Sequence, residues 1–283
     1  MVANQVEGVA TQGIPTSEHL QDAPRSSAMS NPYRITVLIS GSGEQALTKP
    51  ASITSKYYML SPTFLFLGTN LQALMDAAGT ARLPNAQITH VISSRSAVKG
   101  LDRASSHSPP IPSQVCALKT FLNKVPGSSR EDYDREVARR VVETRPDLVV
   151  LAGWMHILSP AFLAIIEGGS TPPACPPGVP TSITNAPTDT TTHSETPCHF
   201  PIPIINLHPA LPGEFDGANA IGRAYEAFQA GEIKRTGVMV HKVVAEVDAG
   251  KPLVIREVEI KEGESLEDLE TRMHEVSHVL LQP

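Results

Sequence analysis

The chain has 283 residues, of which 41% are hydrophobic and 18% charged, so it can bury the core of one large α/β domain or two small ones. Its net charge of −6 comes without a basic block, which argues against a nucleic-acid partner. No apolar run is long enough to span a membrane. The three cysteines form no CxxC pair and no metal-like cluster, which predicts a reducing compartment such as the cytoplasm.

The first part of the chain differs from the rest. Residues 1–32 are polar and aperiodic, and we expect them to be a disordered N-terminal extension. Residues 34–40 are apolar and β-branched and end in Gly41-Ser42-Gly43, a pattern typical of a buried parallel strand that enters a glycine turn. The helix expected next begins only at Gly68, so residues 44–67 interrupt the unit without a clear role.

Strands and helices then alternate along the chain. Ser129 precedes an amphipathic helix over 130–144 and has the chemistry of an N-cap. Further strands are expected at 88–92, 147–152, 202–207, 237–244 and 252–260, the last two as a hairpin-like pair, and further helices at 159–167, 218–229 and 265–281. Residues 168–203 are rich in Pro, Thr and Ser, which predicts a loop that extends outward from the domain.

This alternation predicts the fold class. We expect a Rossmann-like α/β fold with a mostly parallel, twisted sheet flanked by helices. The domain covers 33–283 as a single unit with two insertions, 44–67 and 168–203.

Two polar residues stand at the end of a predicted strand. In open α/β sheets ligands bind at the carboxyl ends of strands, and Asn206 and His208 are alternate residues that can point to one side. An amide can donate to an oxyanion, and an imidazole can move a proton near neutral pH. The alternative, a turn-capping Asn and a structural His, is favoured by the tetrapeptide Asn206–Pro209 taken alone.

Asp248 precedes Ala249-Gly250, a pattern that usually marks only a turn. If its carboxylate approached His208, it would favour the imidazolium and raise the pKa of that histidine. The glycine turn at 40–43 offers backbone N–H groups, as phosphate sites do, but it is not a complete GxGxxG motif.

Taken in order, these segments resemble one family. Residues 35–43 and 68–74, read together without the insertion between them, are similar to the phosphate loop of glycinamide ribonucleotide formyltransferase. The segments 129–134, 146–159, 205–212 and 246–252 are similar to later motifs of the same family in the same order. The resemblance covers about residues 33–281 apart from the two insertions and implies the formyltransferase fold.

The resemblance also implies a reaction and a site. The reaction is formyl transfer from 10-formyltetrahydrofolate to the amine of 5-phosphoribosylglycinamide in purine biosynthesis, with no metal. His208 would be the general acid, Asn206 would stabilise the oxyanion, and Asp248 would orient and charge His208. The resemblance places His241 near the site. The residues implied for folate are Arg130, Met155, His156, Ile157, Leu158, Val244, Ala245, Glu246 and Val247. Those implied for the ribonucleotide are Gly43, Gly68, Thr69, Asn70, His274 and Glu275.

The sequence departs from the family in ways that bear on activity. Family members run Gly-Ser-Gly-Thr-Asn without a break, so we interpret residues 44–67 as translated intron. Ser277 stands where relatives usually carry a glutamate that touches the substrate. Two alternatives stay open: a catalytically impaired isoform that acts only as a binding protein, and a related folate-dependent enzyme such as methionyl-tRNA formyltransferase or formyltetrahydrofolate hydrolase. We expect small-molecule partners and a monomer or homodimer.

Overall fold

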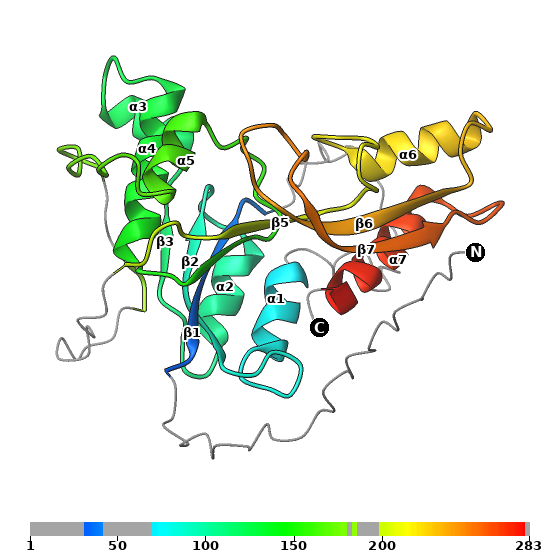
Figure 1. Ribbon diagram of the computed structural model, residues 1–283, viewed down its shortest axis with the longest axis horizontal. Coiled ribbons are helices and arrows are strands. Elements are labelled where there is room, and N and C mark those ends of the chain that lie inside the picture. The colour runs from blue at the N-terminus through cyan, green and yellow to red at the C-terminus, as the bar shows by residue number, and fades with distance from the viewer. Residues whose placement is uncertain (1–30, 42–68, 180–182, 186–197, 281–283) are drawn as a thin grey trace, which may run out of the picture. The chain divides into compact units, whose positions relative to one another are not determined.

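A computed structural model describes residues 31–41, 69–179, 183–185 and 198–280 (Figure 1). The expected disordered extension lies outside the described residues except for its last two, and the insertion at 44–67 lies wholly outside them. All described residues belong to one compact unit that begins at Asn31. Within this part of the chain, no helix combines the length and apolar character needed to cross a membrane.

Strands and helices alternate along the described chain as the sequence predicts. The strands are β1 (Tyr33–Ile39), β2 (Ala86–Ser93), β3 (Ser113–Val115), β4 (Leu148–Leu151), β5 (Ile204–His208), β6 (Arg235–Lys242) and β7 (Pro252–Glu259). The helices are α1 (Thr69–Ala77), α2 (Lys99–Ser106), α3 (Leu118–Lys124), α4 (Arg130–Glu143), α5 (Pro160–Ile166), α6 (Ala220–Gln229) and α7 (Leu266–Leu280).

The strands form one sheet in the order β3-β2-β1-β4-β5-β6-β7. The first five run parallel, and β6 and β7 are antiparallel additions at one edge. This arrangement confirms the predicted mostly parallel α/β sheet and the pairing of the last two strands. It also places β5 between the parallel and antiparallel parts, so β5 has a strand on either side to supply neighbouring groups.

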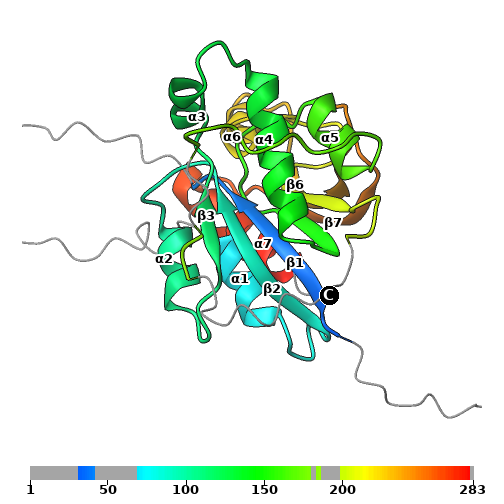
Figure 2. The same cartoon turned by 90° about the vertical axis from the view of Figure 1, so that its left-hand side faces the viewer.

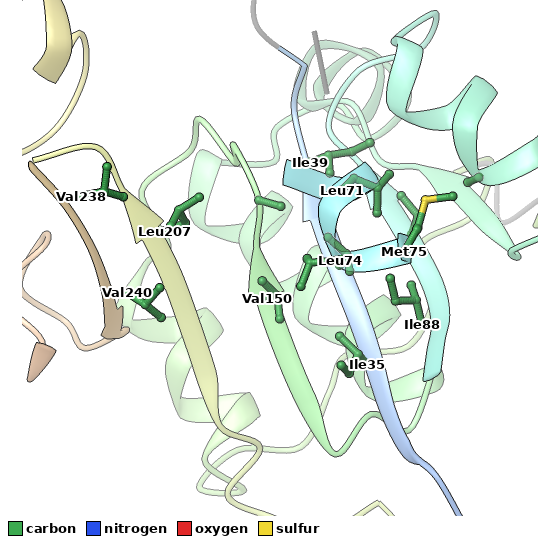
Figure 3. Close-up of a cluster of buried hydrophobic side chains, with 14 of the residues drawn as sticks. Ile35, Ile39, Leu71, Leu74, Met75, Ile88, Val150, Leu207, Val238 and Val240 are labelled. Atoms are coloured by element: carbon green, nitrogen blue, oxygen red, sulfur yellow. The ribbon is translucent and has the colours of Figure 1, made fainter. Parts of the chain in front are cut away.

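Hydrophobic side chains cover both faces of the sheet. Successive residues of β1 alternate between the two cores, because side chains on a strand point to opposite faces. One core joins the sheet to α1, α2, α6 and α7, and Figure 3 shows its centre around Leu71, Leu74 and Val150. The other joins it to α3, α4 and α5. Figure 2 shows α1 and α2 on one side of the strands and α4 and α5 on the other.

Several helices begin at a serine, as predicted for 130–144 and 265–281. The Oγ of Ser129 accepts from the Asp132 N–H at 3.1 Å, and the Asp132 carboxylate accepts the Ser129 N–H in return, which makes a capping box. The Oγ of Ser265 accepts from the Asp268 N–H at 3.1 Å. Each cap satisfies an N–H that has no partner within its helix, which fixes where the helix starts.

The elements α2, β3 and α3 were not predicted. They have eight, three and seven residues, and neither helix has the side-chain N-cap that marks the start of α4. They are held by tertiary contacts instead: Ala104 of α2 and Phe121 of α3 are buried against opposite faces of the sheet.

The insertion at 168–203 does not simply extend outward, as its polar composition predicts. Thr184 and Ser113 exchange two backbone hydrogen bonds of 2.7 and 2.9 Å, so the segment pairs with the edge strand β3. Val179 and Cys198 pack against the core that contains α4. Pairing and packing of this kind protect an otherwise open sheet edge.

Candidate active site

The centre of the candidate site is the end of β5. Asn206 and His208 point to the same side of this strand, because they are two residues apart. Asn206 pairs with Leu151 of β4 on one side and with His241 of β6 on the other. His208 is 4% exposed, whereas Asn206 is half-buried. The register of three strands therefore fixes both groups at the point where the sheet changes from parallel to antiparallel.

Asp248 reaches this point from the loop between β6 and β7. Its Oδ2 lies 3.6 Å from Nδ1 of His208 and accepts the N–H of Gly217 at 2.8 Å. Its Oδ1 lies 3.4 Å from Nδ2 of Asn206. The aspartate has a φ of +54°, a left-handed conformation that Asp adopts more readily than most residues. The structure thus brings together the three side chains expected to carry the chemistry.

His241 completes this group. It is 2% exposed, and its Nδ1 lies 2.9 Å from the carbonyl of Lys242. Because a carbonyl only accepts, Nδ1 carries a proton, and Nε2 lies 3.1 Å from Nδ2 of Asn206 as the acceptor for this amide. Nε2 also lies 3.4 Å from Oδ1 of Asp248. The two amide hydrogens of Asn206 are therefore directed at Asp248 and His241.

The charge state of the pair differs from the sequence-based expectation. Burial lowers the pKa of His208 and outweighs Asp248, which acts in the opposite direction. The pKa of Asp248 is also below its ordinary value: burial would raise it, but the adjacent imidazole of His241, the hydrogen bond from Gly217 and the nearby His208 prevail. Asp248 therefore acts on the pKa of His208 in the expected direction, but burial reverses the net shift. At neutral pH the pair is a carboxylate beside a neutral imidazole.

The proton on the His208 ring can be placed by elimination. Nε2 is buried and has no hydrogen-bond partner among the described residues. The Phe215 carbonyl favours the protonated ring and raises its pKa, and Nδ1 is the nitrogen directed at Asp248, 3.6 Å from its Oδ2. Nε2 consequently has its lone pair available to accept a proton from a bound substrate.

The same region contains the group within the described chain that best fits a metal. One ligand atom each from His208, Asp216 and Asp248 lies within 4.8 Å of the others. Both oxygens of Asp248 already face N–H groups, from Gly217 and from Asn206. The expected absence of a metal stays a prediction.

The segment implied for folate follows β4. The N–H of Met155 donates to Oγ of Ser40 at 2.9 Å, and Arg130 donates to the carbonyl of Ile157 at 2.8 Å. These bonds hold the segment while Met155 and Ile157 remain 57% and 65% exposed, whereas Leu158 is buried. Exposed apolar side chains on an anchored backbone suit a flat, partly apolar ligand.

His156 lies within the same segment. Its ring forms T-shaped pairs with the rings of Tyr133 and Trp154, with centroids 5.7 and 5.4 Å apart. Burial lowers its pKa, and the charges of Arg130 and Arg95 act in the same direction. The ring is therefore neutral near pH 7 and offers an aromatic face and a neutral polar edge.

The second segment implied for folate, 244–247, is exposed throughout. It belongs to the loop that ends in Asp248, and its apolar members are Val244 and Val247. The loop closes where Gly250 packs on the backbone: a Cβ added there would lie 1.6 Å from the carbonyl oxygen of Lys242. Only glycine permits this approach, which helps to place Asp248.

The residues implied for the ribonucleotide are only partly described. Gly43 and Gly68 lie outside the described residues, whereas Thr69 and Asn70 begin α1. Oδ1 of Asn70 is buried without a hydrogen-bond partner in the described chain. His274 and Glu275 lie on α7, which packs against α1.

The side chains on α7 differ in exposure. Burial lowers the pKa of His274, with a smaller effect from His278, whereas Glu275 is exposed. Ser277 is 3% exposed and donates to the carbonyl of Met273 at 2.7 Å, so its hydroxyl is occupied within the helix.

Sequence reasoning missed the loop between β5 and α6. Gly213, Phe215, Gly217 and Asn219 all have positive φ, between 51° and 82°. Alternation of this kind can point successive N–H groups to one side, and Gly217 donates to Asp248. Gly213 and Gly217 could have predicted this loop from the sequence, because glycine often marks positions that need a left-handed backbone.

Comparison with known proteins defines the class. Residues 63–171 and 195–282 match the sequence profile of the Formyl transferase family, and the gap falls within the insertion at 168–203. Two curated relatives carry the name phosphoribosylglycinamide formyltransferase. The protein of Schizosaccharomyces pombe is 41% identical over 76% of this chain and 88% of its own length, and that of Dictyostelium discoideum is 39% identical over 75% and 88%.

A solved structure agrees with this class. Glycinamide ribonucleotide transformylase 1 from Symbiobacterium toebii superposes with a TM-score of 0.59 at 27% identity, covering 88% of this chain and 84% of that one. The chain belongs to the phosphoribosylglycinamide formyltransferase family.

Proposed function

We propose that this chain transfers a formyl group from 10-formyltetrahydrofolate to the amine of 5-phosphoribosylglycinamide, a step of purine biosynthesis. The names of its relatives support the reaction. The observation that carries the proposal is the convergence of Asn206, His208 and Asp248 at the end of β5, with Nε2 of His208 buried and without a partner among the described residues.

The chemistry follows from these groups. The amine attacks the formyl carbon, a new N–C bond forms, and negative charge develops on the formyl oxygen. Asn206 donates one of its two amide hydrogens to this oxygen. The hydrogen that leaves its present partner is the one directed at Asp248, because the 3.4 Å contact with Asp248 is longer than the 3.1 Å contact with His241. Neutral His208 accepts the proton that the amine loses.

The second half of the reaction uses the same histidine. Protonated His208 gives its proton to the folate nitrogen as the C–N10 bond breaks, so that tetrahydrofolate leaves and no net proton is consumed. Asp248 stabilises the imidazolium between the two transfers, as the carboxylate partner of a catalytic histidine does. His208 thus acts as a general acid only after it has acted as a base.

The binding groups are proposed by family resemblance and exposure. Folate is held by Arg130, by the segment 155–158 and by Val244–Val247. The phosphate of the ribonucleotide is held at Gly43, Gly68, Thr69 and Asn70, and its remainder by His274 and Glu275. We further propose that the protein acts in the cytoplasm as a monomer or homodimer, with small-molecule substrates, without a metal, and without a nucleic-acid or membrane partner.

A second candidate rests on the interrupted phosphate loop. Residues 44–67 separate Gly43 from Gly68, which follow one another directly in the family pattern. If they prevent the loop from forming, the chain is an impaired isoform that binds folate without turnover.

The experiment is a formyl-transfer assay with the full chain and with a variant lacking residues 44–67, each tested with ribonucleotide and with water as acceptor. Turnover with the ribonucleotide supports the proposed function. Turnover only in the shortened variant supports the impaired isoform, and formyl release to water alone overturns both in favour of a hydrolase. Inactivity of both variants, with folate still bound, contradicts the proposed reaction.

A further inference from the structure

The side chain of Arg223 in α6 reaches the loop that supports the catalytic pair. Its Nη2 donates to the carbonyl of Phe215 at 2.5 Å and to the carbonyl of Asp216 at 2.6 Å. The guanidinium also lies 5.9 Å from the centre of the Phe215 ring. One cation therefore holds two successive peptide groups of this loop.

Each of these peptide groups is linked to a catalytic residue. The carbonyl of Phe215, which Arg223 binds, also acts on the ring of His208, whose pKa it raises. The carbonyl of Asp216 belongs to the same peptide group as the N–H of Gly217, which donates to Oδ2 of Asp248 at 2.8 Å. In a trans peptide the C=O and N–H point in opposite directions, so a cation that fixes the oxygen also aims the hydrogen.

The loop needs such a clamp. Phe215 has a φ of +51°, a conformation that is unfavourable for a bulky residue and persists only where its surroundings hold it. Gly213 and Gly217 lie on either side of it, also with positive φ, which glycine adopts without steric strain. Because glycine restricts φ and ψ little, these two residues do not hold the loop in one conformation. The loop is exposed at Asp216 and Gly217, so the sheet does not cover it at these positions.

We infer that Arg223 is a positioning residue for formyl transfer, which sets the orientation of His208 and Asp248 through the peptide groups of Phe215 and Asp216. Arg223 does not reach the reacting atoms. It polarises and orients one acceptor for His208 and one donor for Asp248, and hydrogen bonds linked in this way strengthen one another. This inference rests on the roles proposed above for His208 and Asp248.

The test compares Arg223→Ala and Arg223→Lys with Arg34→Ala. Arg34 is a matched control, because its guanidinium also joins two distant segments, by two hydrogen bonds of 3.1 and 2.9 Å to the Asp147 carboxylate. It lies at the start of β1, and its partner precedes β4, away from the carboxyl ends of these parallel strands.

The decisive measurement is a carbon-13 NMR titration of the Asp248 carboxyl in the folded full-length chain, which does not depend on activity. In Arg223→Ala the Gly217 N–H no longer points at Asp248, so the hydrogen bond is lost and the pKa of Asp248 rises. The charged or titratable neighbours of Asp248, which are His208, His241 and Asp216, are the same in the variant and the wild type. Arg34→Ala leaves that pKa unchanged, and Arg223→Lys, which keeps a charge and donors, gives an intermediate value.

Turnover supplies the second measurement. We expect kcat to fall about 100-fold in Arg223→Ala, as a displacement of about 1 Å at a reacting group does. The KM of this variant changes little. The acid limb of its kcat–pH profile moves to higher pH, and millimolar guanidinium restores part of its kcat. Arg34→Ala shows none of these effects beyond a lower melting temperature.

The inference is overturned if the pKa of Asp248 is the same in Arg223→Ala and in the wild type. Should Arg223→Ala fail to fold, the comparison of Arg223→Lys with Arg34→Ala decides in the same way. Wild-type turnover in Asp248→Asn would instead contradict the role proposed for Asp248, and inactivity of the wild type would contradict the proposed function. In both cases the NMR titration would still show whether Arg223 orients the loop.

Discussion

Asn206 and His241 face each other across the β5–β6 pair, and the amide nitrogen of Asn206 lies 3.1 Å from Nε2 of His241. Because Nδ1 of His241 is directed at the carbonyl of Lys242, this ring has one acceptor left, and Asn206 uses it. A buried histidine thus fixes the rotamer of the proposed oxyanion donor.

The first prediction concerns this contact. His241→Phe leaves an N–H of Asn206 without its acceptor, so we expect a loss of about 1–3 kcal/mol in the free energy of unfolding and a lower kcat. His241→Gln keeps an acceptor near the position of Nε2 and should retain more of both. Urea unfolding and steady-state kinetics measure these effects. Equal kcat in the two variants would show that His241 does not orient Asn206.

The second prediction concerns the carboxylate of Asp248. Asp248→Asn removes the negative charge beside His208, and we expect kcat to fall by about 10²-fold or more, the contribution typical of general acid–base catalysis. The melting temperature should change little, because Asn tolerates the φ of +54° that this position has. Asp248→Ala is the control for backbone strain and should melt lower. Near-normal turnover in purified Asp248→Asn would refute the proposed role.

The third prediction concerns the close packing of Gly250. A Cβ at this position would lie 1.6 Å from the carbonyl oxygen of Lys242, so Gly250→Ala must shift the loop that carries Asp248. We expect a destabilisation of about 1–3 kcal/mol, as for overpacking elsewhere, and a clear loss of kcat. Gly169→Ala is a matched control, because its Cβ would meet its nearest atom at 3.5 Å, an ordinary contact. The idea fails if both variants melt and turn over alike.

The fourth prediction concerns pH. The pKa values of His156, His208, His274 and His278 are lowered, chiefly by burial, from an ordinary value of 6.5. Between each lowered value and 6.5 the unfolded chain binds more protons than the folded chain, so stability falls as the pH drops below 6.5. Carboxylates with lowered pKa, such as Asp248, give up their stabilisation only at still lower pH.

Thermal melts recorded from neutral pH to pH 5 test this expectation. The melting temperature should fall over this range, and His274→Gln should reduce the slope because it removes one buried titrating group. A melting temperature that stays constant down to pH 5 would contradict the prediction.

The fifth prediction concerns metals. Because amine attack and proton transfer are assigned to Asn206, His208 and Asp248 alone, treatment with EDTA followed by gel filtration should leave kcat unchanged. Elemental analysis of the treated protein is the control that any metal has gone. A loss of activity restored by one divalent cation would make the group of His208, Asp216 and Asp248 a metal site.

The sequence by itself determined the class of fold and the family. Long strands and helices such as β1, α4 and α7 show their periods locally, and ordered motifs over 35–43, 146–159 and 205–212 resemble one family without reference to distance. The candidate pair on β5 also followed from sequence, because alternate residues of a strand share a face.

Only the tertiary structure decided how these groups work together. Asp248 is 42 residues from Asn206 and 31 from Gly217, and no local pattern specifies such contacts. The neutral state of His208 is a balance between burial and the charge of Asp248, and burial depends on the whole fold. The clamp from Arg223 was equally invisible, because an arginine on a helix is usually a solvated residue, and its partners here are backbone carbonyls that any sequence could provide.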